Sequence, residues 1–219
     1  MAVATQLIDL SGQVAVVTGA SKGMGKAMAM ALAEHGSQVV VSSRKLDACE
    51  ETAAEINAAV GAERAIAIAC NIGYKEQLQA LVDETRSRLG PIDTLLANAG
   101  VNPFYGPMSE IPDEAFDKTM NSNLRSNHWL CQMVAPDMLT KQRGSIMITA
   151  SVGAFGPSDT LGTYNISKMA DIALVRNLAM EWGPHGVRVN ALCPGLIRTD
   201  FAKALWDNPE AAKRVTEQT

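Results

Sequence analysis

The sequence has few aromatic residues, few histidines and no excess of positive charge. Its 219 residues include 19 Lys and Arg against 23 Asp and Glu, which gives a formal net charge of −4. This composition lacks the basic surface that nucleic-acid binding requires. No apolar run approaches the roughly 18 residues of a membrane-spanning helix, and the first residues lack the charged start and apolar core of a secretory signal. We therefore expect a cytoplasmic protein with no nucleic-acid and no membrane partner.

Cysteine and histidine are too scattered to indicate a disulfide framework or a metal centre. The four cysteines stand far apart without a CxxC pair, so we expect reduced thiols. His35, His128 and His185 fall in separate segments that lack the spacing of metal ligands. The sequence therefore predicts no metal site.

Short runs rich in Val and Ile alternate with longer stretches of helical period, an order typical of βαβ units in a parallel sheet. The predicted strands are residues 14–18, 38–42, 65–69, 94–97, 145–149 and 188–192, and the predicted helices are residues 24–34, 46–59, 75–89, 113–139 and 164–182. Because the strands are almost wholly apolar, helices should cover both sheet faces. We expect an α/β fold, a single-domain doubly wound parallel sheet of Rossmann type with six strands. No linker or repeat divides the chain, so this domain should span residues 1–219.

A glycine-rich turn follows the first predicted strand and leads into the first predicted helix. Its sequence, TGASKGMG, spaces the glycines as G-x-x-x-G-x-G. Glycines in this context let backbone amides approach a pyrophosphate at a helix N-terminus. The alternative is a tight strand-to-helix connection without a ligand. The cofactor-binding candidates in the turn are Gly19, Ser21, Lys22, Gly23, Met24 and Gly25.

The end of the second predicted strand indicates which dinucleotide would bind. An acidic residue there would accept the hydroxyl of an adenosine ribose, but the sequence has Ser43, Arg44 and Lys45. Arg44 can form charge-assisted hydrogen bonds with a 2′-phosphate, with Ser43 as a neutral donor and Lys22 adding charge. The pattern favours NADP(H) over NAD(H). The alternative is that Arg44 and Lys45 simply begin a solvated helix.

Tyr164 and Lys168 stand four residues apart, so they project from one face of a helix. An ammonium beside a phenol lowers the pKa of the phenol, which makes proton exchange with a substrate oxygen feasible. By itself such a pair is more often packing and a solvated charge. Ser151 strengthens the case because it follows the fifth predicted strand, and α/β proteins bind ligands at the carboxyl ends of strands. Thr149 is a weaker candidate for the same role.

These motifs, in this order and spacing, resemble those of the short-chain dehydrogenase/reductase family over essentially the whole chain. The resemblance adds Asn98-Ala99-Gly100 and Pro194-Gly195 to the residues above. It implies that Tyr164 is the acid/base, that Lys168 lowers the pKa of Tyr164 and binds the nicotinamide ribose, and that Ser151 polarises the substrate oxygen. Asn123 resembles the asparagine that organises a proton-relay water, although Asn121 and Asn127 stand close by.

The same resemblance assigns further residues to the cofactor. Asn71 stands where the family usually has aspartate, at the adenine amine, and its amide oxygen could still accept a hydrogen bond. The remaining cofactor candidates are Ile72, Asn98, Gly100, Pro194, Ile197 and Thr199. Family members usually continue beyond the position of Thr219 into a seventh strand, so we expect that strand to be absent and the chain to be truncated.

We expect an NADPH-dependent oxidoreductase that acts on a carbonyl or secondary alcohol, similar to the carbonyl and retinal reductase branch and forming a homo-oligomer. Phe155, Phe201 and Trp206 could line an apolar substrate pocket, although such residues are more often plain packing. One alternative is a 3-oxoacyl carrier-protein reductase, for which the cluster of Lys203, Lys213 and Arg214 is thin. Another is a catalytically idle NADP-binding sensor or scaffold.

Overall fold

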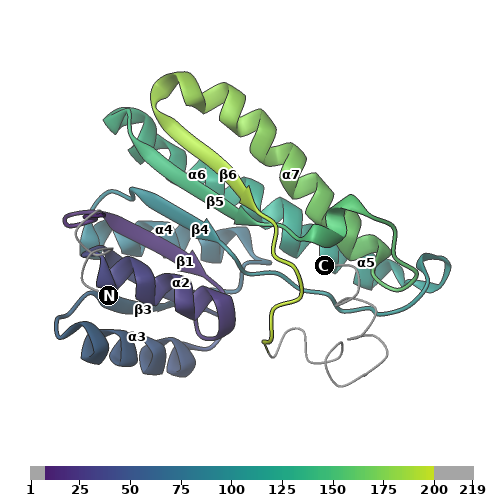
Figure 1. Cartoon of the computed structure of the whole chain (residues 1–219), viewed down its shortest axis with the longest axis horizontal. Coiled ribbons are helices and arrows are strands. Elements are labelled where there is room, and N and C mark those ends of the chain that lie inside the picture. The colour runs from purple at the N-terminus through teal and green to yellow at the C-terminus, as the bar shows by residue number, and fades with distance from the viewer. Residues whose placement is uncertain (1–7, 200–219) are drawn as a thin grey trace.

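The structure is a computed structural model that describes residues 8–199 (Figure 1). Its six strands form one parallel sheet in the order β3-β2-β1-β4-β5-β6. The strands are β1 (Val14–Thr18), β2 (Gln38–Ser43), β3 (Ala65–Ala69), β4 (Thr94–Ala97), β5 (Gly144–Thr149) and β6 (Val187–Leu192). All six predicted strands are confirmed, with ends within one residue. The direction of strand order reverses between β1 and β4, and parallel sheets bind ligands at the carboxyl side of such a point.

Helices cover the two faces of the sheet (Figure 1). The helices are α2 (Gly23–Glu34), α3 (Leu46–Val60), α4 (Lys75–Leu89), α5 (Asp113–Met120), α6 (Ser126–Lys141) and α7 (Gly162–Trp182). One apolar cluster lies under α2 and α3 and is built largely from Ala and Val, so these helices approach the sheet closely. A second, larger cluster joins α4, α6 and α7 to the opposite face.

The strand β6 lies at the edge of the described sheet, beside β5. Val187 and Val189 are buried, whereas Arg188 and Asn190 on the other face are exposed. The apolar cluster under α2 and α3 contains no residue of β6.

The predicted helix of residues 113–139 is interrupted. It consists of α5, a π-helical segment η2 (Asn121–Arg125) and α6. A π-helical turn accommodates an extra residue within a continuous helix and is frequent at functional sites. The residue pattern does not predict this interruption, and the buried positions in and next to it are polar, at Ser122, Asn123, Ser126 and Asn127.

Gly183 follows the last residue of α7 without adopting a left-handed conformation. Its φ of −55° and ψ of −44° are helical, and the chain continues into the short helix η4 (Gly183–His185). The left-handed residue is instead Gly186, with φ of +77°. A side chain at Gly186 would overlap the carbonyl group of Gln142, so glycine is required there.

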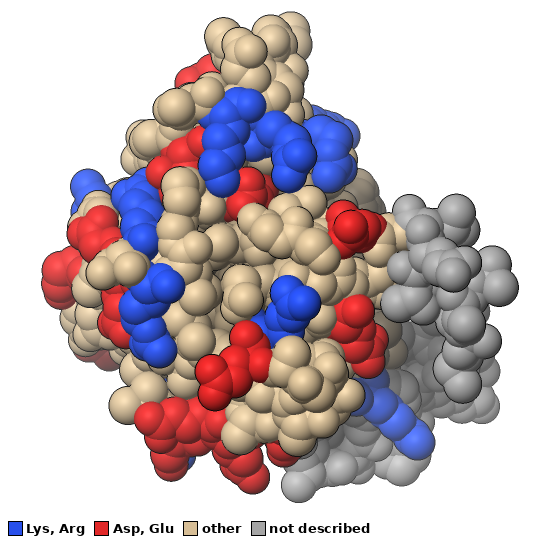
Figure 2. All heavy atoms as spheres, turned by 90° about the vertical axis from the view of Figure 1, so that its left-hand side faces the viewer, with Lys and Arg blue, Asp and Glu red and all other residues tan. Residues whose placement is uncertain are grey.

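The surface at the amino ends of the strands carries acidic and basic side chains together (Figure 2). Among residues 8–199, no helix is both long enough and apolar enough to cross a membrane. The same residues contain no group of three His, Cys, Asp or Glu side chains arranged to hold a metal ion.

Candidate active site

The glycine-rich turn joins β1 to α2 with two residues in the left-handed region. Gly19 has φ of +64° and Gly23 has φ of +57°, a backbone conformation that favours glycine. A Cβ on Gly25 would overlap the carbonyl oxygen of Gly19, so this third glycine allows α2 to pack against the turn. The carbonyl oxygen of Ser21 accepts a hydrogen bond from Thr52 Oγ1 at 3.1 Å, which ties the turn to α3. Lys22 is exposed and Met24 is half-buried at the start of α2.

Asn98 connects the carboxyl ends of three strands. Its Nδ2 donates to the carbonyl oxygens of Thr18 at 3.1 Å and Gly19 at 3.3 Å, and its Oδ1 accepts from Thr149 Oγ1 at 3.3 Å. Asn98 therefore joins the ends of β1, β4 and β5 through its side chain. The hydroxyl of Thr149 donates its hydrogen in this contact. Of the two hydroxyl candidates for a substrate oxygen, we therefore favour Ser151.

The end of β2 presents no carboxylate toward the turn. Arg44 and Lys45 are exposed, and the first acidic residue is Asp47, in the first turn of α3. Ser43 Oγ lies 3.1 Å from Cys49 Sγ, so its hydroxyl already has a partner within the protein.

Asn71 and Ile72 follow β3. Asn71 Oδ1 accepts a hydrogen bond from the backbone N–H of Gly73 at 3.1 Å, which forms a local turn. This side chain thus stabilises its own loop in addition to any contact with a ligand. Ile72 is half-buried and packs against the larger apolar cluster.

The segment after β6 returns across the carboxyl edge of the sheet. The carbonyl oxygen of Pro194 accepts from the N–H of Val152 at 3.1 Å. Five residues later, Thr199 Cγ2 lies only 3.2 Å from the position that a Cβ on Gly23 would occupy. Ile197, between these two contacts, is exposed. The segment therefore joins the region of Ser151 to the glycine turn, although the two are far apart in sequence.

Ser151, Tyr164 and Lys168 lie together at the start of α7. Lys168 Nζ is 5.8 Å from the centroid of the Tyr164 ring, and Ser151 forms a side-chain hydrogen bond with Tyr164. Ser151 Oγ also accepts from the N–H of Gly153 at 3.1 Å, which fixes its orientation at the start of the short helix η3 (Val152–Phe155). Gly100 faces the group from the loop after β4, since a Cβ there would lie 3.6 Å from Lys168 Nζ.

The pKa of Tyr164 depends on burial and on two neighbouring side chains. Burial raises the pKa of the phenol above its usual value; the hydrogen bond with Ser151 lowers this pKa, and the negative charge of Asp171 raises it further. The ammonium of Lys168 forms an ion pair with Asp171 Oδ2 at 3.1 Å.

Asn123 is completely buried in the π-helical segment and faces the same region. Its Oδ1 accepts from the N–H of Val101 at 2.8 Å, and its Nδ2 donates to the Val101 carbonyl and to Ser167 Oγ, both at 3.0 Å. Of its two neighbours, Asn121 instead donates to the carbonyl of Gly73 at 3.0 Å. The structure thus separates the asparagines by location, and Asn123 is the one that bridges the loop after β4 and α7.

Comparisons with known proteins show which family the chain belongs to. The family model described as short chain dehydrogenase matches residues 13–210. The chain belongs to the short-chain dehydrogenase/reductase family. Dehydrogenase/reductase SDR family member 4 of Oryctolagus cuniculus is 37% identical over 214 residues, which covers 98% of this chain and 82% of the relative.

Two solved short-chain dehydrogenase/reductase structures illustrate the likeness in three dimensions. A gluconate 5-dehydrogenase from Burkholderia cenocepacia in complex with NADP and tartrate superposes with a TM-score of 0.91 at 27% identity, covering 99% of this chain and 84% of that one. A 7α-hydroxysteroid dehydrogenase complexed with NADH and 7-oxo glycochenodeoxycholic acid gives 0.88 at 35% identity, covering 94% and 79%. The predicted family and fold are confirmed.

Sequence reasoning about this short-chain dehydrogenase/reductase passed over Asp171 and named Asn127 only as an alternative to Asn123. Asp171 is fully buried on α7, and Asn127 Nδ2 donates to its Oδ1 at 2.9 Å. A signal was present, because Asp171 stands three residues after Lys168 on a helix whose next turns bury Ile172, Val175 and Leu178. A carboxylate in such an apolar stretch is seldom buried without a partner.

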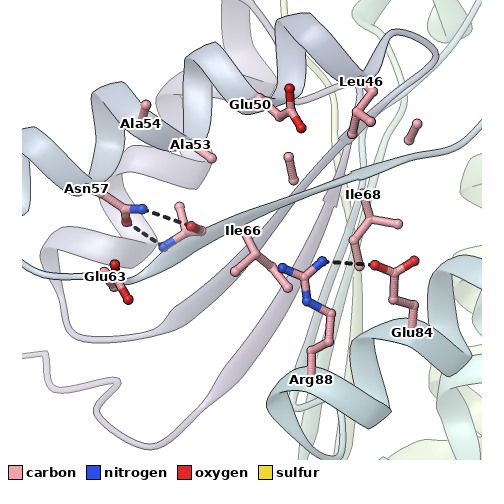
Figure 3. Close-up of a pocket in the computed structure, with 13 residues that line it drawn as sticks. Leu46, Glu50, Ala53, Ala54, Asn57, Glu63, Ile66, Ile68, Glu84 and Arg88 are labelled. Carbon is pink, nitrogen blue, oxygen red and sulfur yellow. Dashed lines mark hydrogen bonds and ion pairs between the residues drawn. The ribbon is translucent and has the colours of Figure 1, made fainter.

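A hollow on the described surface lies away from these residues. It has a volume of about 730 Å³ and runs along the edge strand β3 between α3 and α4 (Figure 3). Arg88 Nη1 donates there to Glu84 Oε1 at 2.9 Å, beside Ile66 and Ile68. None of the predicted site residues lines it, so it is separate from the site at the carboxyl ends of β1, β4 and β5. Phe201 and Trp206, predicted for a substrate pocket, lie outside the described residues, and so does the cluster of Lys203, Lys213 and Arg214.

Proposed function

We propose that this protein is an NADPH-dependent oxidoreductase that interconverts a carbonyl compound and a secondary alcohol. Tyr164 would exchange the proton with the substrate oxygen, Ser151 would hold that oxygen, and Lys168 would bind the nicotinamide ribose. Asn123 would order the loop and water that connect this group to solvent. The observation that carries the proposal is the meeting of Ser151, Tyr164 and Lys168, which come from two separate segments, at the carboxyl ends of β4 and β5.

The protonation of Tyr164 favours reduction. Because burial raises the pKa of the phenol, Tyr164 is protonated at neutral pH and can donate a proton to the oxygen of a ketone or aldehyde. Alcohol oxidation needs the phenolate, so its rate should rise as the pH increases toward that pKa. A bound nicotinamide would supply or accept the hydride, and the residues of this chain orient the substrate and move the proton.

The residues at the glycine turn fit a dinucleotide. Gly19 and Gly23 leave the backbone open to close approach, and no acidic side chain lies in the first turn of α2, where a pyrophosphate would bind. Thr199 closes over Gly23 from the segment after β6. Pro194, Ile197 and Thr199 would therefore cover the nicotinamide side, while Asn71 and Ile72 would border the adenine.

The choice of NADPH over NADH rests on Ser43 and Arg44. Arg44 is exposed at the end of β2, where no carboxylate could accept a ribose hydroxyl. Structural relatives have been solved with NADP and with NADH. The relatives therefore do not indicate one cofactor, and the proposal depends on the residues at the end of β2. Ser43 would contribute less than its neighbour because Cys49 already occupies its hydroxyl.

The relatives give less guidance on the substrate. We favour an apolar ketone or aldehyde of the kind reduced by carbonyl reductases, because the loops beside Tyr164 expose Val152, Phe155 and Tyr105. We also propose a cytoplasmic homo-oligomer. No observation on the described residues favours the carrier-protein reductase over this assignment.

A panel of ketones, aldehydes and a 3-oxoacyl thioester, assayed by loss of NADPH absorbance, tests the proposal. Turnover of at least one simple carbonyl compound would support it. Preferential turnover of the thioester would favour the carrier-protein reductase. NADPH binding by calorimetry without turnover of any compound would favour an idle sensor or scaffold.

A further inference from the structure

Lys168 is one member of a buried polar chain that links β5, α7 and α6. Its ammonium donates to the carbonyl oxygen of Thr149 at 2.7 Å and to Asp171 Oδ2 at 3.1 Å. The other oxygen of Asp171 accepts from Asn127 Nδ2, and this amide also donates to the carbonyl oxygen of Asn123 at 2.6 Å. The side chains of Lys168 and Asp171 are 4% and 0% exposed.

A carboxylate at this depth needs a physical reason. Removing an ion from water costs several kcal/mol even after relaxation, and a buried pair is often no more stable than apolar residues of similar volume. Burial raises the pKa of Asp171 even though the charge of Lys168 lowers it. The adjacent core residues of α7 are Ile172 and Val175, so packing alone would be served by an apolar side chain. The partner of Asp171 is the ammonium beside Tyr164, which connects it to the chemistry of the site.

We propose that Asp171 is a positioning residue of the catalytic centre, which holds the ammonium of Lys168 beside Tyr164 and compensates its charge, while Asn127 fixes the carboxylate from α6. This inference rests on the proposed function, because it concerns the lysine that would assist Tyr164. It adds two positioning residues behind Lys168, neither of which would touch the substrate.

The geometry gives Asp171 two effects. An ammonium has three N–H donors, and among the described residues the oxygens of Thr149 and Asp171 accept two of them. The long lysine side chain is thereby held in one rotamer, with one donor left for a ribose hydroxyl. The second effect is electrostatic: the negative charge of Asp171 opposes ionisation of the phenol, so Tyr164 remains the proton donor that reduction requires.

The first test is Asp171→Asn, which keeps the shape of the side chain and removes its charge. Misplacement of a catalytic group by about 1 Å can cost 10²-fold in rate, so we expect kcat for ketone reduction to fall by about ten- to a hundred-fold. The KM for the ketone should change little, because Asp171 does not contact the substrate.

The pH profile provides a readout that a purely structural role would not move. Reduction needs protonated Tyr164, so its rate declines as the pH rises through the pKa of the phenol. Loss of the Asp171 charge lowers that pKa, and the alkaline decline should therefore move to lower pH. The titratable groups that interact with Asp171 among residues 8–199 are Lys168 and Tyr164 on α7 and Cys131 on α6. Burial is the largest influence that raises the pKa of Cys131 to about 12, so this thiol stays protonated across the range assayed.

A double-mutant cycle with Lys168→Met separates the inference from the proposed function. If Asp171 acts through Lys168, the Lys168→Met, Asp171→Asn double variant should be no slower than Lys168→Met alone. Asn127→Ala, which loosens the carboxylate without removing it, should give a smaller loss of kcat and serves if Asp171→Asn fails to fold. Asp137→Asn is the matched control, because Asp137 lies away from the site and forms an ion pair with Arg86, with 3.0 Å between Oδ2 and Nε. This variant should lower Tm without changing kcat or the pH profile.

The outcomes are distinct. Unchanged turnover in Lys168→Met would overturn the proposed function. A strong loss in Lys168→Met together with wild-type kcat and pH profile in Asp171→Asn and Asn127→Ala would overturn only the role of Asp171. Additive losses in the double variant would likewise show that Asp171 does not act through Lys168.

Discussion

The glycine turn at the start of α2 and the polar cluster on α7 both lie at the carboxyl edge of the sheet, but different interactions shape them. The turn is a backbone structure in which Gly19, Gly23 and Gly25 lie within seven residues of sequence, and two of the three have positive φ. The cluster on α7 is a side-chain structure. Its key contacts join residues from β5, η2, α6 and α7 across 19 to 44 positions of sequence. The comparison shows that the backbone shape of the turn depends mainly on nearby residues, whereas the electrostatics around Tyr164 depends on long-range packing.

Removal of the Tyr164 hydroxyl should lower turnover without affecting the glycine turn. Tyr164→Phe keeps the ring and removes the proton, so turnover should fall by about 10² to 10⁴, the usual contribution of general acid catalysis. NADPH affinity, measured by calorimetry, should stay close to wild type. Tyr74→Phe, at an exposed tyrosine before α4, is the control. Near wild-type ketone reduction by the Tyr164→Phe variant would show that another group supplies the proton.

Removal of the Arg44 guanidinium should weaken NADPH binding without affecting the cluster on α7. Hydrogen bonds to charged partners contribute about 1.5 to 3 kcal/mol, so Arg44→Ala should weaken NADPH by about ten- to a hundred-fold and change NADH little. Adding Ser43→Asp should shift the preference to NADH, because a carboxylate repels the phosphate and accepts from the ribose hydroxyl.

The measurement for Arg44 is kcat/KM with both cofactors at one ionic strength, since salt screens exposed charges. Arg176→Ala removes the same charge from an exposed position on α7 and should alter neither cofactor. A wild-type enzyme that already prefers NADH would contradict this interpretation and leave the role of Tyr164 untouched.

A single methyl group should test how tightly the turn is packed. A Cβ on Gly25 would overlap the Gly19 carbonyl and lie 2.7 Å from Asn98 Nδ2, so Gly25→Ala forces the backbone to move. Overpacking of this kind costs about 1 to 3 kcal/mol. Denaturant unfolding should show that loss, and NADPH affinity should fall with it. Full stability with full affinity would mean that the turn is more adaptable than its contacts indicate.

The smallest predicted effect is a gain in stability, from Gly183→Ala. Gly183 has helical angles at the end of α7 and nothing within 4 Å of the position its Cβ would occupy. Gly183→Ala should therefore stabilise the protein by about 0.4 to 1 kcal/mol, through the lower entropy of the unfolded chain. Thermal unfolding measures it and also serves as the control for Gly25→Ala. A drop in Tm would show that Gly183 needs conformational freedom that its dihedral angles do not reveal.

The sequence predicted the strands to within one residue because buried parallel strands leave unbroken apolar runs between glycine and proline signals. It did not predict the π-helical segment η2 (Asn121–Arg125), because residue types alone do not show which carbonyl each backbone amide bonds.

By itself the sequence determined the order of the elements, the open backbone of the glycine turn and the shared helical face of Tyr164 and Lys168, because each depends on residues within a few positions of one another. Only the tertiary structure decided the charge around Tyr164. Its pKa depends on burial and on the Lys168–Asp171 ion pair, which Thr149 and Asn127 hold from β5 and α6. Electrostatic interactions act through space, so their sign at Tyr164 follows from which elements pack against α7.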